Sequence, residues 1–341
     1  MKKIIKKAGF IFLIVLLTGC IGKREILISG KTMGTTYHIT VVTGYFEDTA
    51  GLEEEIEKRL KAVNRSMSTY MKDSEISRFN ALKNTDEKFY ISDDFLQVMI
   101  IAKKVYEFTG GAWDGTVDPL VTMWGFGRFG VKDSVPSAEE IKTCLARVGF
   151  EQIEISEEKY LRKKNASVSL DLASIAKGYG VDQIADLIGK KGFKDFLVEI
   201  GGEVLASGLR TDGKPWKIGI NTPRKDALLN QVYNVVNLQN KALATSGDYR
   251  IFFEAEGKRY SHILDPKTGY PVTNRVVSVS VMADNCTLAD GLATGLMVMG
   301  HEKGIEAVNR IKGVECLIVV EEENGSFKDY CSKGFKRIIE N

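Results

Sequence analysis

Glycines interrupt two segments of this chain that otherwise have the character of helices. The segments run over 171–182 and 284–295, and their interior glycines are Gly178, Gly180, Gly291 and Gly295. A glycine inside a helix costs on the order of 1 kcal/mol relative to alanine. Such costs placed close together indicate that the helix packs tightly against a neighbour or lets a ligand approach its backbone.

The later segment also carries a pair of oxygen-bearing side chains. Asp290 and Thr294 are four residues apart, so on a helix their oxygens lie on one face, one turn from each other. A carboxylate and a hydroxyl suit a hard cation, and Mg²⁺ takes few protein oxygens and leaves room for water and substrate phosphates. The pair favours a magnesium site. An ordinary capped helix packed through its glycines stays open as the alternative.

The earlier segment begins with groups that suit an anion. It follows a strand-like run over 167–170, and Asp171 is placed to cap the helix. Ser174 and Lys177 lie on its first turns, where backbone N–H groups and the helix dipole favour negative charge. We expect an anion-binding helix start here, with a merely weak helix as the alternative.

Further motifs share their order along the chain with one protein family. They are Met-Gly-Thr-Thr-Tyr at 33–37, Met-Ser-Thr-Tyr at 67–70 with 74–80, Gly-Ala-Trp-Asp-Gly within 111–120, Glu-Ile-Gly-Gly-Glu at 199–203, and the run over 261–269 that ends in Asp-Pro-Lys-Thr-Gly. With the two glycine-bearing segments, they resemble the ApbE family of flavin transferases over roughly residues 30–335. The resemblance implies an enzyme that transfers the FMN half of FAD to a Thr or Ser hydroxyl of an acceptor protein and releases AMP.

The same resemblance implies roles for particular residues. For Mg²⁺ it implies Asp290 and Thr294, with a further oxygen from around Ser174. For FAD, the substrate, it implies contacts at Met33, Tyr70, Ala112, Trp113, Asp114, Asp171 and Lys177. Core packing for Met33 and Tyr70, plain capping for Asp171, and a backbone-only contact for Trp113 stay open as alternatives.

His262 is the best candidate for a catalytic base. It lies at the end of an expected strand, just before the turn over 265–269, and a turn beside a site is a common place for catalytic groups. An imidazole there could accept the proton of an incoming hydroxyl near neutral pH. A satisfied structural histidine is the alternative.

The first nineteen residues have the pattern of a bacterial signal peptide. Four lysines precede an apolar run over 8–17 that is too short to span a bilayer as a stable helix. The run ends in Leu-Thr-Gly-Cys, which looks like a lipobox with Cys20 as the lipidated residue. We expect removal of 1–19, a lead-in over 20–29, and a body held outside the cytoplasm on a bacterial membrane. An uncleaved anchor with an incidental cysteine is the alternative.

Beyond this segment, strands and helices are mixed without strict β–α–β alternation, which favours an α+β fold over a doubly wound sheet. Helices are expected over 49–63, 93–109, 137–149 and 302–310, strands over 37–43, 196–205, 216–221, 233–238, 276–282 and 316–320, and a hairpin from 251–256 to 259–264. We predict a single two-lobed domain over 30–337 with a mixed, largely antiparallel sheet and packed helices, as in the ApbE family.

Charge and cysteine spacing argue against other classes of protein. Removing residues 1–19 takes the formal charge from +2 to −2, and no Lys/Arg cluster with interleaved aromatics suggests a nucleic-acid surface. The remaining cysteines lack C-x-x-C spacing, which disfavours a structural zinc site. Whether Cys144, Cys286, Cys316 and Cys331 form disulfides stays open.

Two other functions stay open. A Mg²⁺-dependent FAD pyrophosphatase would share the site chemistry, with water in place of the protein hydroxyl. A non-catalytic lipoprotein that binds a flavin or another solute would share the lipobox, but it would not need Asp290 and Thr294 beside an anion-binding helix start. For a transferase, the resemblance implies an acceptor among subunits of membrane redox complexes or extracytoplasmic reductases.

Overall fold

The computed structural model describes residues 22–127, 135–224, 226–228, 231–248, 252–255 and 258–337. The expected signal peptide over 1–19 and the expected lipidation site Cys20 lie outside these residues. In the part of the chain that is described, no helix is both long enough and apolar enough to cross a membrane.

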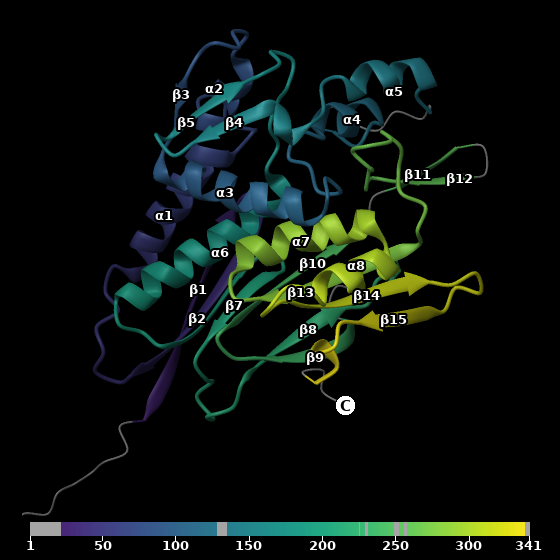
Figure 1. Ribbon diagram of the computed structural model, residues 1–341. Helices are drawn as coiled ribbons and strands as arrows, with labels where there is room; N and C mark the ends of the chain where they lie inside the picture. The colour runs from purple at the N-terminus through teal and green to yellow at the C-terminus, as the bar shows by residue number, and fades with distance from the viewer. Residues whose placement is uncertain are drawn as a thin grey trace, which may run out of the picture.

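An antiparallel sheet forms the body of the molecule, and within the described residues it has eight strands (Figure 1). In sheet order they are β1 (Lys23–Thr32), β2 (Thr35–Gly44), β6 (Asp195–Ile200), β7 (Glu203–Ser207), β10 (Lys241–Gly247), β13 (Val276–Ala283), β14 (Glu315–Glu321) and β15 (Phe327–Cys331). Strand side chains alternate between faces, so in β2 Val41 joins the core on one side and Val42 the core on the other. The sheet therefore has two buried faces.

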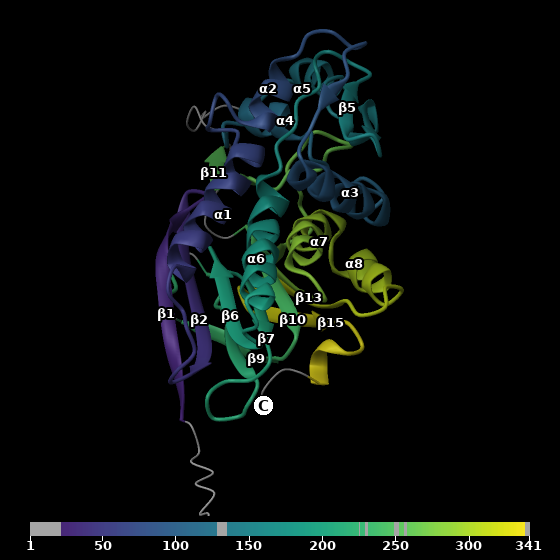
Figure 2. The same cartoon turned by 90° about the vertical axis from the view of Figure 1, so that its left-hand side faces the viewer.

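Helices cover one face of this sheet (Figure 2). They are α1 (Leu52–Met67), α6 (Ala173–Lys190), α7 (Cys286–Met299) and α8 (His301–Val308). Ile56 of α1 and Ile184 of α6 pack with Val41 of β2. On the opposite face, β8 (Trp216–Asn221) and β9 (Val232–Leu238) form a separate antiparallel pair whose Trp216 packs with Val42.

A second lobe stands at one end of the sheet (Figure 1). It contains the small sheet β3 (Phe89–Tyr90), β5 (Tyr160–Lys163) and β4 (Ile153–Ser156), the helices α2 (Glu75–Ala81), α3 (Asp93–Phe108), α4 (Asp118–Met123) and α5 (Ala138–Leu145), the 3₁₀ turn Phe150–Gln152, and the hairpin β11 (Phe252–Ala255) and β12 (Lys258–Ser261). Phe95 of α3 and Leu292 of α7 belong to the same buried core. The lobes are thus parts of one domain, and the α+β prediction with a largely antiparallel sheet is confirmed.

Two expected strands are wrong in detail. The run over 196–205 is not one strand but the hairpin of β6 and β7, because the chain turns at Gly201 and Gly202. These residues have φ angles of 62° and 103°, a backbone region that favours glycine. The expected strand over 259–264 ends at Ser261, and the rest of its hairpin at 251, 256 and 257 lies outside the described residues.

The strand-like run over 167–170 is not assigned as a strand, although its apolar residues Val168 and Leu170 are buried. Asn80 takes the place of a partner strand there. Its side-chain amide donates to the Leu170 carbonyl at 2.8 Å, and its Oδ1 accepts from the Leu170 N–H at 2.7 Å. The expected strand-like conformation is therefore not part of a sheet, and a side chain satisfies the Leu170 backbone that a sheet would otherwise satisfy.

Candidate functional site

The core of the candidate site is the crossing of α6 and α7. A Cβ atom added to Gly178 would lie 2.4 Å from the Cys286 carbonyl oxygen and 2.8 Å from Asp290 Cβ, so only glycine fits. The Gly178 N–H donates to Asp290 Oδ2 at 2.9 Å. Close helix packing is therefore the reason for this glycine, and the same packing buries the Asp290 carboxylate, which is 2% exposed.

Lys177 lies between two buried carboxylates at this crossing. Its Nζ is 3.2 Å from Glu203 Oε1 and 3.6 Å from Asp290 Oδ1. Burial by itself would lower the pKa of Lys177, but the negative charges of Asp290 and Glu203 outweigh burial and raise that pKa above its usual value. Lys177 is thus a permanent cation near the start of α6.

Glu203 is the main site residue to which the sequence gave no role. It is 3% exposed, and within the described part of the chain its Oε2 has no hydrogen-bond partner. Burial first, and then the charge of Asp290, raises the pKa of Glu203 to about 8 against the opposing effect of Lys177. Its only sequence signal is its position directly after the Gly201–Gly202 turn, where the hairpin returns toward α6.

Asp182 on α6 is a second residue that the sequence did not indicate, and it binds directly to α7. Its carboxylate accepts from the backbone N–H groups of Cys286 at 2.7 Å and Thr287 at 2.8 Å, and from the Thr287 hydroxyl. Burial is the largest influence on the pKa of Asp182 and raises it. The carboxylate thus binds the N-terminus of α7, where the helix dipole favours negative charge.

Trp113 joins the start of α6 to the middle of α7. Its indole Nε1–H donates to Ser174 Oγ at 2.9 Å. A Cβ added to Gly295 would lie 3.1 Å from Trp113 Cβ, so this residue packs against α7 at Gly295. The Thr294 hydroxyl is 2.9 Å from Ser246 Oγ at the end of β10. The structure therefore pairs Ser174 with Trp113, and Thr294 with Ser246, a further hydroxyl that the sequence did not indicate.

The carboxylates of Asp114 and Asp171 both accept hydrogen bonds from backbone N–H groups. Asp114 Oδ1 accepts from the Thr116 N–H at 2.7 Å and Oδ2 from the Phe150 N–H at 3.0 Å; burial raises the pKa of Asp114. Asp171 Oδ1 accepts from the Ala173 N–H at 2.8 Å. The N-cap residue of α6 is Leu172, which makes no capping side-chain bond, so the expected cap at Asp171 is wrong by one residue. The Asp171 N–H also donates to the Gly115 carbonyl at 2.7 Å, tying the 111–120 motif to the start of α6.

Met33 and Tyr70 both lie between regular elements, but their surroundings differ. Met33 occupies the two-residue turn between β1 and β2 with φ 50°, and its Cε is 2.8 Å from where a Gly180 Cβ would be, so it packs on α6. Tyr70 is 79% exposed on the loop between α1 and α2, which excludes core packing. Ala112 is half-buried in the loop before Trp113.

His262 is placed by a different set of elements. It follows β12 directly, and its ring lies edge-on to Phe126 with centroids 6.3 Å apart. The next turn is closed by a bond from the Gly269 N–H to the Asp265 carbonyl at 2.8 Å. Within that turn, Lys267 Cε is 3.5 Å from where a Gly111 Cβ would be, so the 261–269 motif lies against the 111–120 motif.

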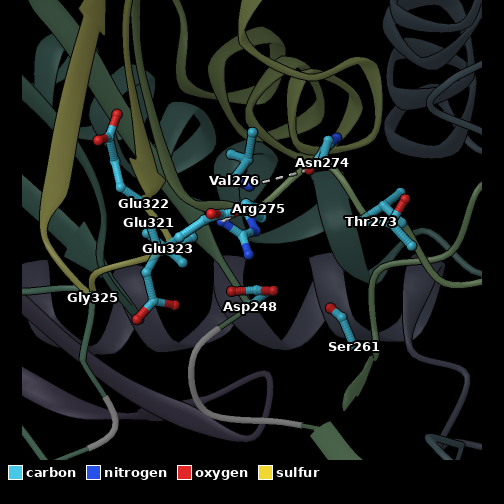
Figure 3. Close-up of a pocket in the computed structure, with 12 residues that line it drawn as sticks. Asp248, Ser261, Thr273, Asn274, Arg275, Val276, Glu321, Glu322, Glu323 and Gly325 are labelled. Carbon is cyan, nitrogen blue, oxygen red and sulfur yellow. Dashed lines mark hydrogen bonds and ion pairs between the residues drawn. The ribbon is translucent and has the colours of Figure 1, made fainter. Parts of the chain in front are cut away.

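A pocket of about 450 Å³ lies beside these elements (Figure 3). Its lining includes Ser261, which precedes His262, and Asp248, two residues beyond Ser246. Most of its charged lining is acidic: Asp248, Glu321, Glu322 and Glu323 against Arg275. Arg275 Nη1 is itself 3.6 Å from Glu323 Oε1. Such a lining disfavours the binding of phosphate groups in this pocket.

The donor atoms at the helix crossing fit Mg²⁺ better than a softer metal. Among the described residues, no group of three or more His, Cys, Asp or Glu side chains could hold a metal ion. What the crossing offers is the Asp290 carboxylate with hydroxyls of Thr294 and Ser174, and a nearby buried carboxylate oxygen of Glu203 that lacks a hydrogen bond. Mg²⁺ is typically bound by few protein oxygens, which leaves coordination positions for substrate phosphates. The described cysteines are all free thiols.

The fold and site define a class of α+β proteins with a buried acid–lysine cluster at a glycine-packed helix crossing. Comparison with known proteins identifies the family. The ApbE family model matches residues 33–318, so the chain belongs to the ApbE family. The FAD:protein FMN transferase of Vibrio cholerae serotype O1 is 45% identical over 328 residues, covering 96% of each chain. That of Escherichia coli K12 is 34% identical over 92% of this chain and 89% of its own length.

Solved structures agree with this membership. The flavin transferase ApbE from Vibrio cholerae superposes with a TM-score of 0.84 at 43% identity, covering 93% of this chain and 99% of that chain. The apo form of the Pseudomonas stutzeri flavinyl transferase ApbE gives a TM-score of 0.83 at 36% identity, covering 93% and 97%.

Proposed function

We propose that this chain is an FAD:protein FMN transferase, which moves the FMN half of FAD to a Thr or Ser hydroxyl of an acceptor protein and releases AMP. The observation that carries the proposal is the half-buried Lys177 ammonium between the buried carboxylates of Asp290 and Glu203 near the start of α6. It supplies a fixed positive charge where a pyrophosphate is expected, beside oxygens that fit Mg²⁺. The names of the relatives support the same reaction.

Phosphoryl transfer depends mainly on positioning and charge neutralisation. In the proposed reaction, the acceptor oxygen forms a bond to the FMN phosphorus, the bond from phosphorus to the AMP oxygen breaks, and AMP leaves with that electron pair. A ring nitrogen of His262 takes the hydroxyl proton. Asp290, Thr294 and an oxygen near Ser174 would hold Mg²⁺, which when bound neutralises charge on the pyrophosphate.

The remaining predicted residues would orient FAD. Met33 on the β1–β2 turn and Tyr70 on the exposed loop after α1 offer surfaces for a flat ring. Trp113 and Asp114 hold the loop that reaches α6, and since their side chains are bonded within the protein, we expect their FAD contacts, like that of Ala112, to be made by the backbone.

One assay separates the proposed transferase from its alternatives. FAD and Mg²⁺ are incubated with the protein, with and without an acceptor protein, and AMP and acceptor-bound flavin are both quantified. A transferase produces AMP that matches covalently bound flavin and depends on the acceptor. AMP formed equally well without acceptor identifies a pyrophosphatase, and FAD binding without AMP identifies a binding protein.

We further propose that the chain is a lipoprotein outside the cytoplasm, with residues 1–19 removed and Cys20 lipidated. The acceptor would then be a subunit of a membrane redox complex or an extracytoplasmic reductase. Mass spectrometry of the native protein tests this, since an unmodified internal Cys20 would contradict it. Replacing Cys20 by Ala should release the protein from membranes while AMP formation persists.

A further inference from the structure

A tight turn at the end of β2 exposes two aromatic side chains. The Glu47 N–H donates to the Gly44 carbonyl at 3.2 Å, and the Gly44 N–H donates to Glu47 Oε2 at 2.8 Å. Tyr45 and Phe46 occupy the two central positions of this turn, and they are 59% and 92% exposed. The turn thus holds both aromatic residues at the tip that follows β2.

This turn lies where the described chain begins. Lys23, the first residue of β1, pairs with Gly44 across the strands. A Cβ added to Gly22 would lie 3.0 Å from Tyr45 Cε2, so the tyrosine ring packs against Gly22. Cys20 is two residues earlier, and a chain extends by at most about 3.6 Å per residue. The Cα atom of Cys20 is therefore within about 7 Å of the Cα atom of Gly22.

We propose that Tyr45 and Phe46 insert into the interfacial region of the bilayer that holds a lipidated Cys20. The inference rests on the lipid anchor proposed above. An acyl chain attached within about 7 Å of Gly22 brings the bilayer surface to this turn, whatever the conformation of the two intervening peptide units. Aromatic side chains gather at that depth of a membrane, and a tyrosine presents an apolar ring with a polar end.

The charged groups around the turn are compatible with this contact. The Lys23 side chain is 52% exposed and pairs with Asp195 at 2.7 Å. The carboxylates of Glu47 and Asp48 accept from the backbone N–H groups of Gly44 and Ala50, so both are turned toward their own loop. The two rings are thus the most prominent apolar groups at this end.

The contact has a consequence for the acceptor. Met33 and the turn at 45–46 lie at opposite ends of the β1–β2 hairpin (Figure 2). Strand β1 has ten residues, and at about 3.3 Å per residue it is about 33 Å long. A bilayer at the aromatic turn therefore places the candidate site up to about 33 Å above the membrane surface. An acceptor must present its hydroxyl at that height, on an extracytoplasmic domain or a raised segment.

Fluorescence quenching tests the contact in the full lipidated protein. Phe46→Trp is reconstituted in phosphatidylcholine–phosphatidylglycerol vesicles with or without bromine atoms on the upper acyl chain. The matched control is Tyr90→Trp, because Tyr90 is a 67% exposed aromatic on β3 in the other lobe. After subtraction of the native tryptophans, emission from position 46 should fall about twofold in brominated vesicles, and emission from position 90 should not change.

The outcomes separate this inference from the proposals beneath it. Equal emission at position 46 in both vesicles, with Cys20 shown to be lipidated by mass spectrometry, overturns the contact and leaves the anchor standing. An unmodified Cys20 overturns both. AMP release from FAD reports the enzymatic function independently. If Phe46→Ser instead converts a dimer to a monomer, a second copy covers the turn and the membrane contact is wrong.

Discussion

The two halves of the candidate site are built differently. The half that holds Asp290 and Lys177 lies at the crossing of two long helices, where glycine leaves no free space and a backbone N–H fixes the carboxylate. The half that holds His262 consists of turns and short elements around β12 and α4. In the proposed mechanism, the charges that must stay in place are therefore carried by two packed helices, and the group that would meet an incoming acceptor protein is carried by loops.

Replacing Asp290 by Asn should have the largest effect on activity. The amide keeps an oxygen for the Gly178 N–H, so the helix crossing should survive, but the charge that attracts Mg²⁺ is lost. We expect FMN transfer to fall at least about 10³-fold, since a bound metal ion contributes several kcal/mol of transition-state stabilisation. Calorimetric titration with Mg²⁺ should show weakened binding. Full turnover in this variant, or in excess chelator, would rule out the metal assignment.

Replacing His262 by Ala tests the half of the candidate site that is carried by turns and short elements. If His262 is the general base, FAD and Mg²⁺ affinities stay near wild type, and FMN transfer falls by roughly 10²–10⁴-fold. His38→Ala is the matched control, because His38 lies on β2 and its ring bonds to Glu199 at 2.6 Å. A structural role for His262 predicts a lower melting temperature instead, with activity loss that follows the unfolded fraction. A stable variant with near wild-type transfer would remove His262 from the mechanism.

Two glycines of α6 should respond in opposite ways to the same substitution. Gly178→Ala puts a methyl group against the backbone of α7, and overpacking of this kind costs about 1–3 kcal/mol. Gly189→Ala adds a methyl group in open space on the same helix, where alanine should stabilise by up to about 1 kcal/mol. Denaturant midpoints measure both. Equal effects at the two positions would mean that the helix crossing is not tightly packed in solution.

The sequence predicted those features of the site that depend on neighbours along the chain. Asp290 and Thr294 do lie one turn apart on a helix, and a helix does follow Asp171, although its N-cap residue is Leu172. The glycine costs indicated tight packing, which Gly178 confirms, but they could not identify the partner helix. For the fold, alternation predicted most strands, whereas the turn at Gly201 was missed because apolar residues continue on both sides of it.

The missed residues act through contacts between distant parts of the chain. Asp182 binds residues more than a hundred positions later, and Ser246 on β10 bonds to Thr294 on the helix α7. Glu203 follows an apolar strand and a turn, and nothing in its neighbourhood along the sequence indicates that it will be buried beside Lys177. Local periodicity carries no information on such pairs, because it describes a face of one element and not the element that covers that face.

The last prediction concerns the protonation state of the Glu203 carboxyl group. Its pKa is raised to about 8 in the folded protein, against an ordinary value of 4.5. A carboxyl group whose pKa rises on folding contributes its stability fully below the unfolded value and loses it as pH rises through the folded value. The window is therefore about pH 4.5 to 8, and metal-free wild-type protein should lose stability across it. Glu203→Gln cannot ionise, so this contribution to the pH dependence disappears.

The comparison of wild type with Glu203→Gln isolates one group. Other carboxyl groups with raised pKa values, including Asp182 and Asp114, are unchanged in the variant and cancel in the difference. Over pH 5 to 9 a pKa raised this far is worth about 4 kcal/mol, so the melting temperature of wild type should fall by about 6 °C more than that of the variant. Parallel curves would mean that Glu203 is already ionised in the folded protein, with the ion pair to Lys177 outweighing burial. The rigid half of the site would then hold its full negative charge at neutral pH, before any cation binds.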